Sequence, residues 1–550
     1  MRRRVITGAV VTATGLAFLA AVPGSATAEP GNAVDYTVVA ADGTSAAEAT
    51  AAIKAAGGTI VTGNDAVGVY RVTSADTGFG TKAVKSGALI GASERRAIGR
   101  APNGLEKIER DVRRGGSAAH GSKKLDPLDD KLWGLAMVRA DKARKIESGD
   151  RGVTVGILDT GLDASNPDLA PHFSTKLSRN FAPDLVDVDG ACEVASCVDP
   201  IGTDDNGHGT HVAGTIGAAA NGVGLSGIAP DVTLVELKGG QDSGYFFLDP
   251  VVNALTHAAD SGLDVVNMSF YVDPWLYNCT ANPADSAEDQ AEQRAIIAAM
   301  KRALNYAHRK GVTLVGALGN NHEDLGKPRT DVSSPDYGAD PYPREIDNNS
   351  CWDLPVEGPH VIGVSSVGPS KRKADYSNYG VEQISVAAPG GFARDGFGTP
   401  TYNTPGNRIL SSYPLKVLIE EGLVDAAGNI LPAGEGLVFK DCTNAGKCGY
   451  YTYLQGTSMA APHAAGVAAL IVSKYGKRDW RRGGVTMDPK AVERQLYRTA
   501  AEQSCPEPRL VSYANEGRPA EFDAYCEGGR QFNGFYGYGI VDAYAAVGGR

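Results

Sequence analysis

Long apolar runs are missing from the sequence after its first 28 residues, and none approaches the ~20 residues that a membrane-spanning helix needs. We therefore expect no membrane anchor. Residues 1–28 combine arginines at positions 2–4 with an apolar run at 10–22, and they end in Ala-Thr-Ala at 26–28. This pattern is typical of a cleaved export signal and predicts a secreted protein. The arginines alone do not distinguish a twin-arginine route from other routes.

Positive charge is scarce in most of the chain. The first 124 residues hold sixteen Lys or Arg against ten Asp or Glu, a net charge of +6. Because the whole chain is at −11, residues 125–550 carry −17. Binding to a nucleic-acid backbone depends on clustered Lys and Arg that displace counterions. We therefore expect no nucleic-acid partner.

Cysteine is absent from the first 191 residues, and the chain has no C-x2-C pair of the kind that holds zinc. Its eight cysteines are an even number, which predicts disulfides in an exported protein. Eight cysteines allow roughly a hundred pairings. The short spacings favour Cys192 with Cys197 and Cys442 with Cys448, which leaves Cys279 with Cys351 and Cys505 with Cys526.

The length of 550 residues exceeds the ~100–150 of a typical domain, so we expect more than one folding unit. Residues 29–124 form a cysteine-free first unit with a helix that begins at the capping-box pair Ser45 and Glu48 and ends at Gly57. Strands are expected at 36–39, 59–62 and 67–72. We predict a small α+β domain followed by a basic processing linker at 95–124.

From residue 125 onward, apolar β-rich runs alternate with longer helical patterns. The runs lie at 153–158, 232–237, 265–268, 312–315 and 361–364. Continuous apolar runs are typical of strands that are buried on both faces of a parallel sheet. The sequence therefore predicts an α/β domain with a doubly wound, mostly parallel sheet. Ligands of such folds bind at the carboxyl ends of the strands.

Three chemically distinct side chains lie at the ends of these elements. Asp159 follows the run at 153–158, His208 begins a Gly- and Ala-rich segment, and Ser458 precedes the helical run at 464–473. A serine hydroxyl becomes a nucleophile when a base removes its proton and a carboxylate orients that base. Alone, Asp159 could simply cap a turn. His208 and His211 have metal-ligand spacing but no HExxH motif, so we interpret His211 as a hydrogen-bonded structural residue.

In the chain order Asp, His, Ser, these segments closely resemble the subtilisin-like serine proteases, or subtilases. The resemblance covers most of residues 125–550, including Gly319-Asn320, the segment 388–390 and the segment 537–543. It implies a subtilisin-like catalytic domain over residues 125–550 in which Asn320 is the oxyanion-hole amide. It also implies that the unit at 29–124 is an inhibitory, chaperone-like propeptide.

The mechanism implied by this resemblance is acyl transfer. Ser458 attacks a peptide carbonyl, His208 takes and returns the proton, and Asp159 orients and stabilises the imidazolium. The Asn320 amide and the backbone N–H of Ser458 stabilise the negative carbonyl oxygen. Water then releases the acyl group, which makes the protein a serine endopeptidase.

The expected substrate-binding edge departs from the family. Where subtilases carry Ser-Leu-Gly-Gly, this chain has Ser269, Phe270, Tyr271 and Val272, and the resemblance assigns the first three and Gly319 to substrate binding. An insertion at 322–350 carries several carboxylates and alters the same wall. A preference for basic side chains is one interpretation of these carboxylates, and a solvated loop is the one we favour. For a second insertion at 391–453 we expect a surface role rather than a role in the cleft.

Calcium is common in subtilases. The resemblance places the side-chain ligands of a structural calcium site at Asp168 and Asn221, with carbonyl oxygens from Val223 and Leu225. The alternative is a turn that uses the same Asn-Gly chemistry. No organic cofactor is expected.

Two other functions fit the sequence less well than a secreted endopeptidase. A catalytically inactive, subtilase-like extracellular binding protein is disfavoured because all three triad side chains and Asn320 are present. An esterase or lipase of another fold is disfavoured because no G-x-S-x-G motif surrounds Ser458. We expect a monomer that acts on protein or peptide substrates and is inhibited by its own propeptide.

Overall fold

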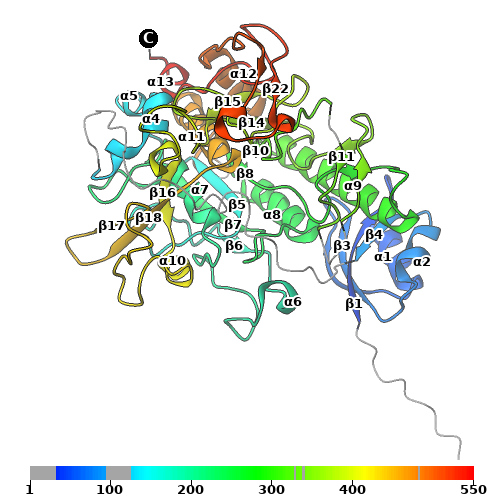
Figure 1. Ribbon diagram of the computed structural model, residues 1–550. Coiled ribbons are helices and arrows are strands. Elements are labelled where there is room, and N and C mark those ends of the chain that lie inside the picture. Colours follow the sequence, from blue (N-terminus) through cyan, green and yellow to red (C-terminus); the bar gives the residue numbers. More distant parts are fainter. Residues whose placement is uncertain (1–32, 95–125, 328–329, 337–340, 481–482, 550) are drawn as a thin grey trace, which may run out of the picture.

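The computed structural model describes residues 33–94, 126–327, 330–336, 341–480 and 483–549. The predicted signal peptide and the predicted processing linker lie outside these residues. The described chain forms a small N-terminal domain beside a larger α/β domain (Figure 1).

The small domain is a four-stranded antiparallel sheet with two helices. Its strand order is β2 (Thr59–Asn64), β3 (Val69–Ser74), β1 (Val34–Ala40), β4 (Leu89–Glu94), and its helices are α1 (Ala46–Ala55) and α2 (Phe79–Lys85). The predicted capping box of Ser45 and Glu48 is confirmed at the start of α1. The helix α2 and the strand β4 were not among the predicted elements. Gly78 precedes α2 without a side-chain cap, so the usual start signal is missing there.

The larger domain is built on a seven-stranded sheet in which every pairing is parallel. The order is β15 (Val386–Pro389), β14 (Val361–Val367), β10 (Thr313–Ala317), β8 (Val265–Met268), β5 (Thr154–Asp159), β7 (Thr233–Lys238), β6 (Arg179–Asn180). The predicted α/β fold with a mostly parallel sheet is thereby confirmed. The strands β6 and β7 lie on one side of β5 and the later strands lie on the other side. The strand order therefore reverses at β5, as in other doubly wound sheets.

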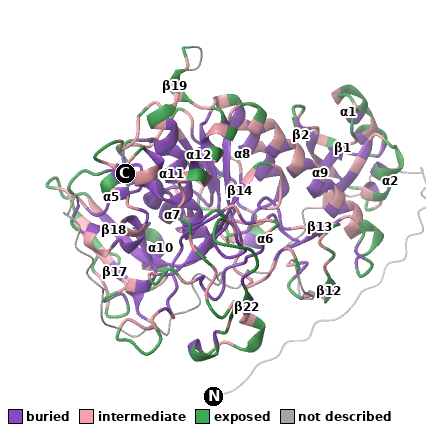
Figure 2. Cartoon of the chain, turned by 90° about the horizontal axis from the view of Figure 1, so that it is seen from above, coloured by how far each residue is buried: buried purple, intermediate pink, exposed green. Residues whose placement is uncertain are grey.

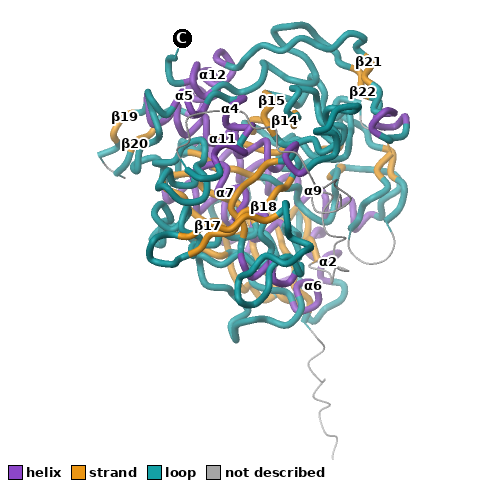
Figure 3. Tube along the Cα trace, turned by 60° about the vertical axis from the view of Figure 1, so that its left-hand side comes forward, coloured by secondary structure: helices purple, strands orange, loops and turns teal. Residues whose placement is uncertain are grey.

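Helices cover both faces of this sheet (Figures 2 and 3). One face packs on α7 (His208–Gly217) and α11 (Thr457–Tyr475), and the other packs on α8 (Leu248–Ser261) and α9 (Ala287–Arg309). Neighbouring residues of β5 divide between these two cores, since Ile157 belongs to the first and Leu158 to the second. This burial on both faces explains why the strands read as continuous apolar runs.

The small domain rests on α8 and α9. The side-chain amide of Asn64 donates to Oδ1 of Asn253 at 2.9 Å, and the Ser93 hydroxyl donates to Glu292 at 2.7 Å. Gly91 lies so close to α9 that a Cβ atom there would come within 2.5 Å of the Ala291 carbonyl oxygen. The sheet of the small domain therefore sits directly against the backbone of α9.

The second insertion is not confined to the surface. It contains the three-stranded sheet β16 (Ile409–Tyr413), β18 (Cys448–Leu454), β17 (Val438–Cys442) and the helix α10 (Leu415–Glu420). Tyr413 and Tyr451 of this sheet are buried in the same core as α7 and α11. The expected surface role is therefore wrong for β16 and β18, because their aromatic side chains complete the core.

Shorter elements connect these parts. They are α4 (Trp133–Met137), α5 (Ala140–Ala143), α6 (Val186–Asp189), α12 (Pro489–Thr499), α13 (Ala543–Ala546), β9 (Asn278–Cys279), β11 (Thr330–Asp331), β12 (Arg344–Glu345), β13 (Cys351–Trp352), β19 (Lys477–Arg478), β20 (Val485–Thr486), β21 (Leu510–Val511) and β22 (Ala524–Tyr525). All four predicted disulfides are present, namely Cys192–Cys197, Cys279–Cys351, Cys442–Cys448 and Cys505–Cys526. Within the described ranges, no helix has the length and apolarity needed to cross a membrane.

Candidate active site

Asp159 and His208 meet at the carboxyl edge of the sheet. Asp159 is the last residue of β5, and His208 is the first residue of α7, directly after Gly207, whose φ of +95° favours glycine. The Nδ1 atom of His208 lies 2.7 Å from Oδ1 of Asp159. Burial raises the pKa of Asp159, and the neighbouring His208 opposes that rise. The pair has the geometry of a histidine held in one tautomer by a buried carboxylate.

A second buried carboxylate, Asp204, fixes the start of α7, and it was missed from the sequence. It accepts hydrogen bonds from the backbone N–H groups of Gly207 and Thr210, both at 2.9 Å, and from the Thr160 hydroxyl at 3.0 Å. Burial raises the pKa of Asp204, but the bonds from Thr210 and Gly207 outweigh it, so the pKa lies below its ordinary value. An acidic residue shortly before a helix start is the only local signal for this role.

Ser458 is brought to the same edge by Ser269. Its hydroxyl donates to the Ser269 carbonyl oxygen at 3.2 Å, and the Ser269 hydroxyl donates back to the Ser458 carbonyl oxygen at 3.1 Å. Ser269 directly follows β8, where Met268 pairs with Leu158, the neighbour of Asp159. The three predicted triad residues therefore lie at the ends of adjacent elements. Ser458 is the second residue of α11, and the N-terminal end of a helix favours negative charge.

Asn320 is oriented by the residue before Ser458. Its Oδ1 atom accepts hydrogen bonds from the backbone N–H of Thr457 at 2.9 Å and from the Thr457 hydroxyl at 3.0 Å. A backbone N–H can only donate, so this branch of the amide must be the oxygen. The other branch of the Asn320 amide is therefore Nδ2, a hydrogen-bond donor. Thr457 was also missed from the sequence, although it belongs to the same motif as Ser458.

The predicted substrate-binding edge is held from behind by aromatic and acidic groups. The Phe270 ring stacks on Phe246 with centroids 4.0 Å apart. The Tyr271 hydroxyl donates to Oδ2 of Asp336 at 2.7 Å, so a residue of the insertion at 322–350 fixes the orientation of the Tyr271 side chain. Ser269 and Gly319 lie at the ends of β8 and β10 respectively. All four residues assigned to substrate binding therefore lie near the carboxyl edge.

The first insertion is only partly a solvated loop. Arg344 is completely buried there, and its guanidinium pairs with Asp285 at 2.8 Å and with Asp331 at 3.1 Å. It also donates to the carbonyl oxygen of Tyr277 at 3.1 Å. A buried cation with two carboxylate partners anchors the insertion, so the favoured interpretation of a solvated loop is wrong for this part.

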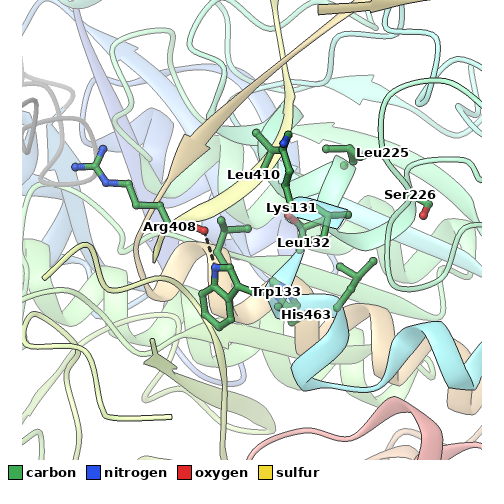
Figure 4. Close-up of a pocket in the computed structure, with 13 residues that line it drawn as sticks. Lys131, Leu132, Trp133, Leu225, Ser226, Arg408, Leu410 and His463 are labelled. Atoms are coloured by element: carbon green, nitrogen blue, oxygen red, sulfur yellow. Dashed lines mark hydrogen bonds between the residues drawn. The ribbon is translucent and has the colours of Figure 1, made fainter. Parts of the chain in front are cut away.

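Two cavities adjoin this region. The larger has a volume of about 490 Å³ and is lined by Tyr277, Asn320, Glu323, Val332 and Gly456 among others. The smaller, about 10 Å³, lies behind the edge and has room for roughly one water molecule (Figure 4). There the Trp133 indole donates to the Arg408 carbonyl oxygen at 2.9 Å. Only the larger cavity reaches the residues of the candidate active site.

Two other histidines have structural roles. Nε2 of His211 lies 3.0 Å from the Ile409 carbonyl oxygen, which confirms its interpretation as a hydrogen-bonded residue. His463 borders the smaller cavity and bonds through Nδ1 to the Met459 carbonyl oxygen at 2.8 Å. Burial lowers the pKa of His463 to about 4. It is therefore a neutral core residue.

The four predicted calcium-binding residues lie together, but hydrogen bonds already engage the ligand side chains of Asp168 and Asn221. Oδ2 of Asp168 accepts from the Tyr451 hydroxyl at 2.7 Å and from the Leu225 N–H at 3.0 Å. Oδ1 of Asp168 accepts from the Asn221 amide at 3.3 Å, and Oδ1 of Asn221 accepts from the Val223 N–H at 3.0 Å. Calcium needs six to eight oxygen ligands around one point. As arranged, donors face the Asp168 carboxylate, and this arrangement does not fit a calcium ion.

Two acidic clusters elsewhere have ligand spacing among the described residues. They consist of Asp184, Glu193 and Asp199, and of Glu193, Asp205 and Asp242. Lysines already compensate both clusters. Lys238 lies 3.4 Å from Asp199 and 2.6 Å from Asp242, and Lys416 lies 2.7 Å from Asp205. A metal ion is therefore not required at either cluster.

Comparison with known proteins identifies the family. The profile of the Subtilase family matches residues 150–539, which contain all the candidate catalytic residues. The chain belongs to the subtilase family. It is 30% identical to subtilisin DY of Bacillus licheniformis over 343 residues, which are 62% of this chain and 85% of that protein. It is therefore a subtilisin-like serine protease, a hydrolase of proteins or peptides.

Solved structures agree with this subtilase in fold. The epidermin leader peptide processing serine protease of Staphylococcus aureus has a TM-score of 0.61 and 19% identity, covering 94% of this chain and 98% of that one. Fervidolysin of Fervidobacterium pennivorans, a keratinolytic enzyme, has a TM-score of 0.55 and 23% identity, covering 94% of this chain and 61% of that one. At these identities the likeness concerns the fold alone.

Proposed function

We propose that this subtilase is a secreted serine endopeptidase whose triad is Asp159, His208 and Ser458. The observation that carries the proposal is the 2.7 Å contact between His208 Nδ1 and Asp159 Oδ1, at the edge where Ser458 is tied to Ser269. A carboxylate, an imidazole and a hydroxyl brought to one edge support nucleophilic catalysis by the hydroxyl.

In the proposed reaction, the Ser458 hydroxyl attacks the carbonyl carbon of the substrate. His208 accepts the hydroxyl proton on Nε2 and becomes an imidazolium, which the buried Asp159 carboxylate stabilises through Nδ1. His208 then returns that proton to the leaving amine. Water attacks the acyl-serine ester by the same route, releases the acid and restores the serine hydroxyl.

Negative charge develops on the carbonyl oxygen in each addition step. The Asn320 Nδ2 group and the Ser458 backbone N–H are the donors that we assign to it. Thr457 positions Asn320 through the two bonds to its Oδ1 atom. A donor that is already oriented needs no reorganisation as the charge forms, which lowers the barrier.

We further propose that residues 1–28 direct export and that the domain at 29–124 is an inhibitory propeptide of a monomeric enzyme. Four disulfides favour an oxidising compartment outside the cell. The small domain packs its sheet on α8 and α9, which also cover the central sheet, so it can assist folding of that face. Its release would follow cleavage within 95–124.

The test is a Ser458→Ala variant of the full chain, compared with Ser512→Ala at an exposed serine. We expect Ser458→Ala to lower casein hydrolysis by about a millionfold and to accumulate as an uncleaved precursor, with an unchanged circular dichroism spectrum. Ser512→Ala should mature and hydrolyse casein normally. Hydrolysis retained in Ser458→Ala would refute the nucleophile, and a wild-type protein without hydrolysis would favour an inactive binding protein.

A further inference from the structure

A buried carboxyl group that has no side-chain hydrogen bond or ion pair to the described residues lies beside the residues assigned to the oxyanion. Asp353 is 3% exposed, and its Oδ2 atom lies 3.4 Å from the position of a Cβ atom built on Gly319. Gly319 precedes Asn320 and has a φ of +102°, and the Asn378 amide packs against it, with its Nδ2 atom beside the same Cβ position. Asp353 is therefore within one residue of the proposed oxyanion site.

The Tyr277 hydroxyl shares this position. It is buried and has no hydrogen-bond partner among the described residues, and Asp353 is the charged group that raises its pKa most after burial itself. Tyr277 lines the cavity of about 490 Å³ that also reaches Asn320 and Gly456. The Tyr277 side chain thus lies at the wall of a cavity that reaches the candidate active site, and the Asp353 carboxyl lies behind this wall rather than on it.

A strand pairing, a disulfide and a buried hydrogen bond hold Tyr277 and Asp353 in place. In the antiparallel pair β13–β9, Cys351 opposes Cys279 and Trp352 opposes Asn278, so Asp353 continues the register opposite Tyr277. The disulfide Cys279–Cys351 joins the same two strands. From behind, the buried Arg344 donates to the Tyr277 carbonyl oxygen. The pair is therefore built into a rigid part of the fold.

The Asp353 and Glu357 carboxyl groups are largely buried and have no cationic partner in the part of the chain that the structure describes. Burial raises the pKa of Asp353 well above its usual range, and the nearby Glu357 carboxyl raises it further. The pKa of Glu357 is itself raised to about 7, mainly by burial. Among the described residues, no Lys or Arg forms an ion pair with either carboxyl. The buried Arg344 pairs with Asp285 and Asp331, and Arg518, which lines the cavity, pairs with Asp375. Buried carboxyls without a cation cost free energy unless a ligand supplies one.

We propose that the cavity beside Asn320 receives a cationic side chain, Lys or Arg, of the substrate residue whose carbonyl is attacked. The ammonium or guanidinium group binds the Asp353 carboxylate. The Tyr277 hydroxyl then donates a hydrogen bond to the same carboxylate. The inference rests on the proposed function and specifies its substrate class. A charged pair formed out of water is strong and selective, because the neutral analogue leaves the carboxyl unpartnered.

The experiment uses purified mature wild-type enzyme and peptide amides that differ only in the residue before the scissile bond. Arginine is compared with citrulline, its neutral isostere, and lysine with norleucine. We expect kcat/KM to be about 100-fold higher for each cationic peptide than for its neutral partner. Equal values within each pair would overturn the inference while leaving the proposed endopeptidase intact. Failure to cleave any peptide or casein would count against the proposed function instead.

Variants locate the preference. Asp353→Asn keeps the shape of the side chain, and we expect it to lower kcat/KM for the arginine peptide by about 10²-fold while the citrulline peptide is cleaved as before. Tyr277→Phe should lower the arginine-to-citrulline ratio several-fold. Asp347→Asn removes the same charge from an exposed position of the first insertion and should change nothing. A cationic preference that survives in Asp353→Asn would assign the recognition to another residue and refute the role of Asp353.

Discussion

Thr457 donates two hydrogen bonds to a single atom, Oδ1 of Asn320, from its backbone N–H at 2.9 Å and from its hydroxyl at 3.0 Å. Its hydroxyl in turn accepts the N–H of Gly319 at 3.0 Å. The residue next to the proposed nucleophile thus sets the orientation of the proposed oxyanion donor. Nucleophile and oxyanion donor are consequently positioned as one unit.

Loss of the Thr457 hydroxyl should therefore reduce turnover rather than binding. In Thr457→Val the backbone bond to Asn320 remains and the hydroxyl bonds are lost. We expect kcat to fall about tenfold with KM little changed, against about 10²- to 10³-fold for Asn320→Ala. Steady-state kinetics on one peptide amide gives both constants. A rise in KM at constant kcat would indicate that Thr457 shapes substrate binding instead.

The loop at 221–225 should be stable without calcium. Because the Tyr451 hydroxyl and two amide groups already satisfy the Asp168 carboxylate, we expect a chelator to leave the Tm of the Ser458→Ala protein unchanged. Tyr451→Phe should lower the free energy of unfolding by about 1–3 kcal/mol, since it leaves a buried acceptor short of a donor. A Tm that falls with chelator and recovers with calcium, but not in Asp168→Asn, would instead establish the calcium site that the resemblance predicts.

Stability should depend on pH through His463. Its pKa is lowered by burial from an ordinary 6.5 to about 4, so between these values the unfolded chain binds a proton that the folded chain does not. The stabilisation is complete above pH 6.5 and is lost as the pH falls toward 4, by about 3 kcal/mol in all. Urea unfolding of the Ser458→Ala protein at several pH values measures it.

The control is His463→Asn, whose amide can still donate to the Met459 carbonyl oxygen but does not titrate. We expect its free energy of unfolding to fall less than that of the parent protein between pH 7.5 and pH 4.5. Parallel pH profiles for the two proteins would mean that His463 contributes nothing to the acid lability.

Gly91 should matter for maturation. A Cβ atom there would approach the Ala291 carbonyl oxygen to 2.5 Å, so Gly91→Val should push the small domain away from α9 and reduce the yield of mature enzyme several-fold. Gly80→Ala is the matched control in the same domain, because its Cβ would meet nothing closer than 3.8 Å. The amounts of precursor and mature protein after expression, separated by electrophoresis, distinguish the two. Normal maturation of Gly91→Val would argue against a folding role for this interface.

Local signals were enough to predict many elements. The capping box at Ser45, the five apolar runs of the central sheet and the two short cysteine pairs each depend on residues a few positions apart. The helix α2 lacks such a signal, and β4 gains its place by pairing with β1, about 50 residues earlier in the chain. These two elements could not be predicted because their stabilising contacts are distant in sequence.

Non-local packing also overturned two expectations about the insertions. Arg344 lies in a segment that was expected to be a solvated loop, but in the folded protein its guanidinium group pairs with Asp285 and Asp331. Likewise Tyr413 and Tyr451 complete a core formed by helices that begin at His208 and Thr457. Composition indicates that an insertion is polar or aromatic, but burial depends on which surface it folds against.

The sequence by itself determined which groups we propose to react and their order, Asp159, His208, Ser458, because motifs and strand patterns depend on residues that are close together in the chain. The tertiary structure alone decided what surrounds them. It placed Asp204 under the start of α7, Thr457 against Asn320, and the buried Asp353 beside Gly319. Hydrogen bonds and charge pairs act over a few ångströms, so they depend on how strands far apart in the chain come together in one sheet.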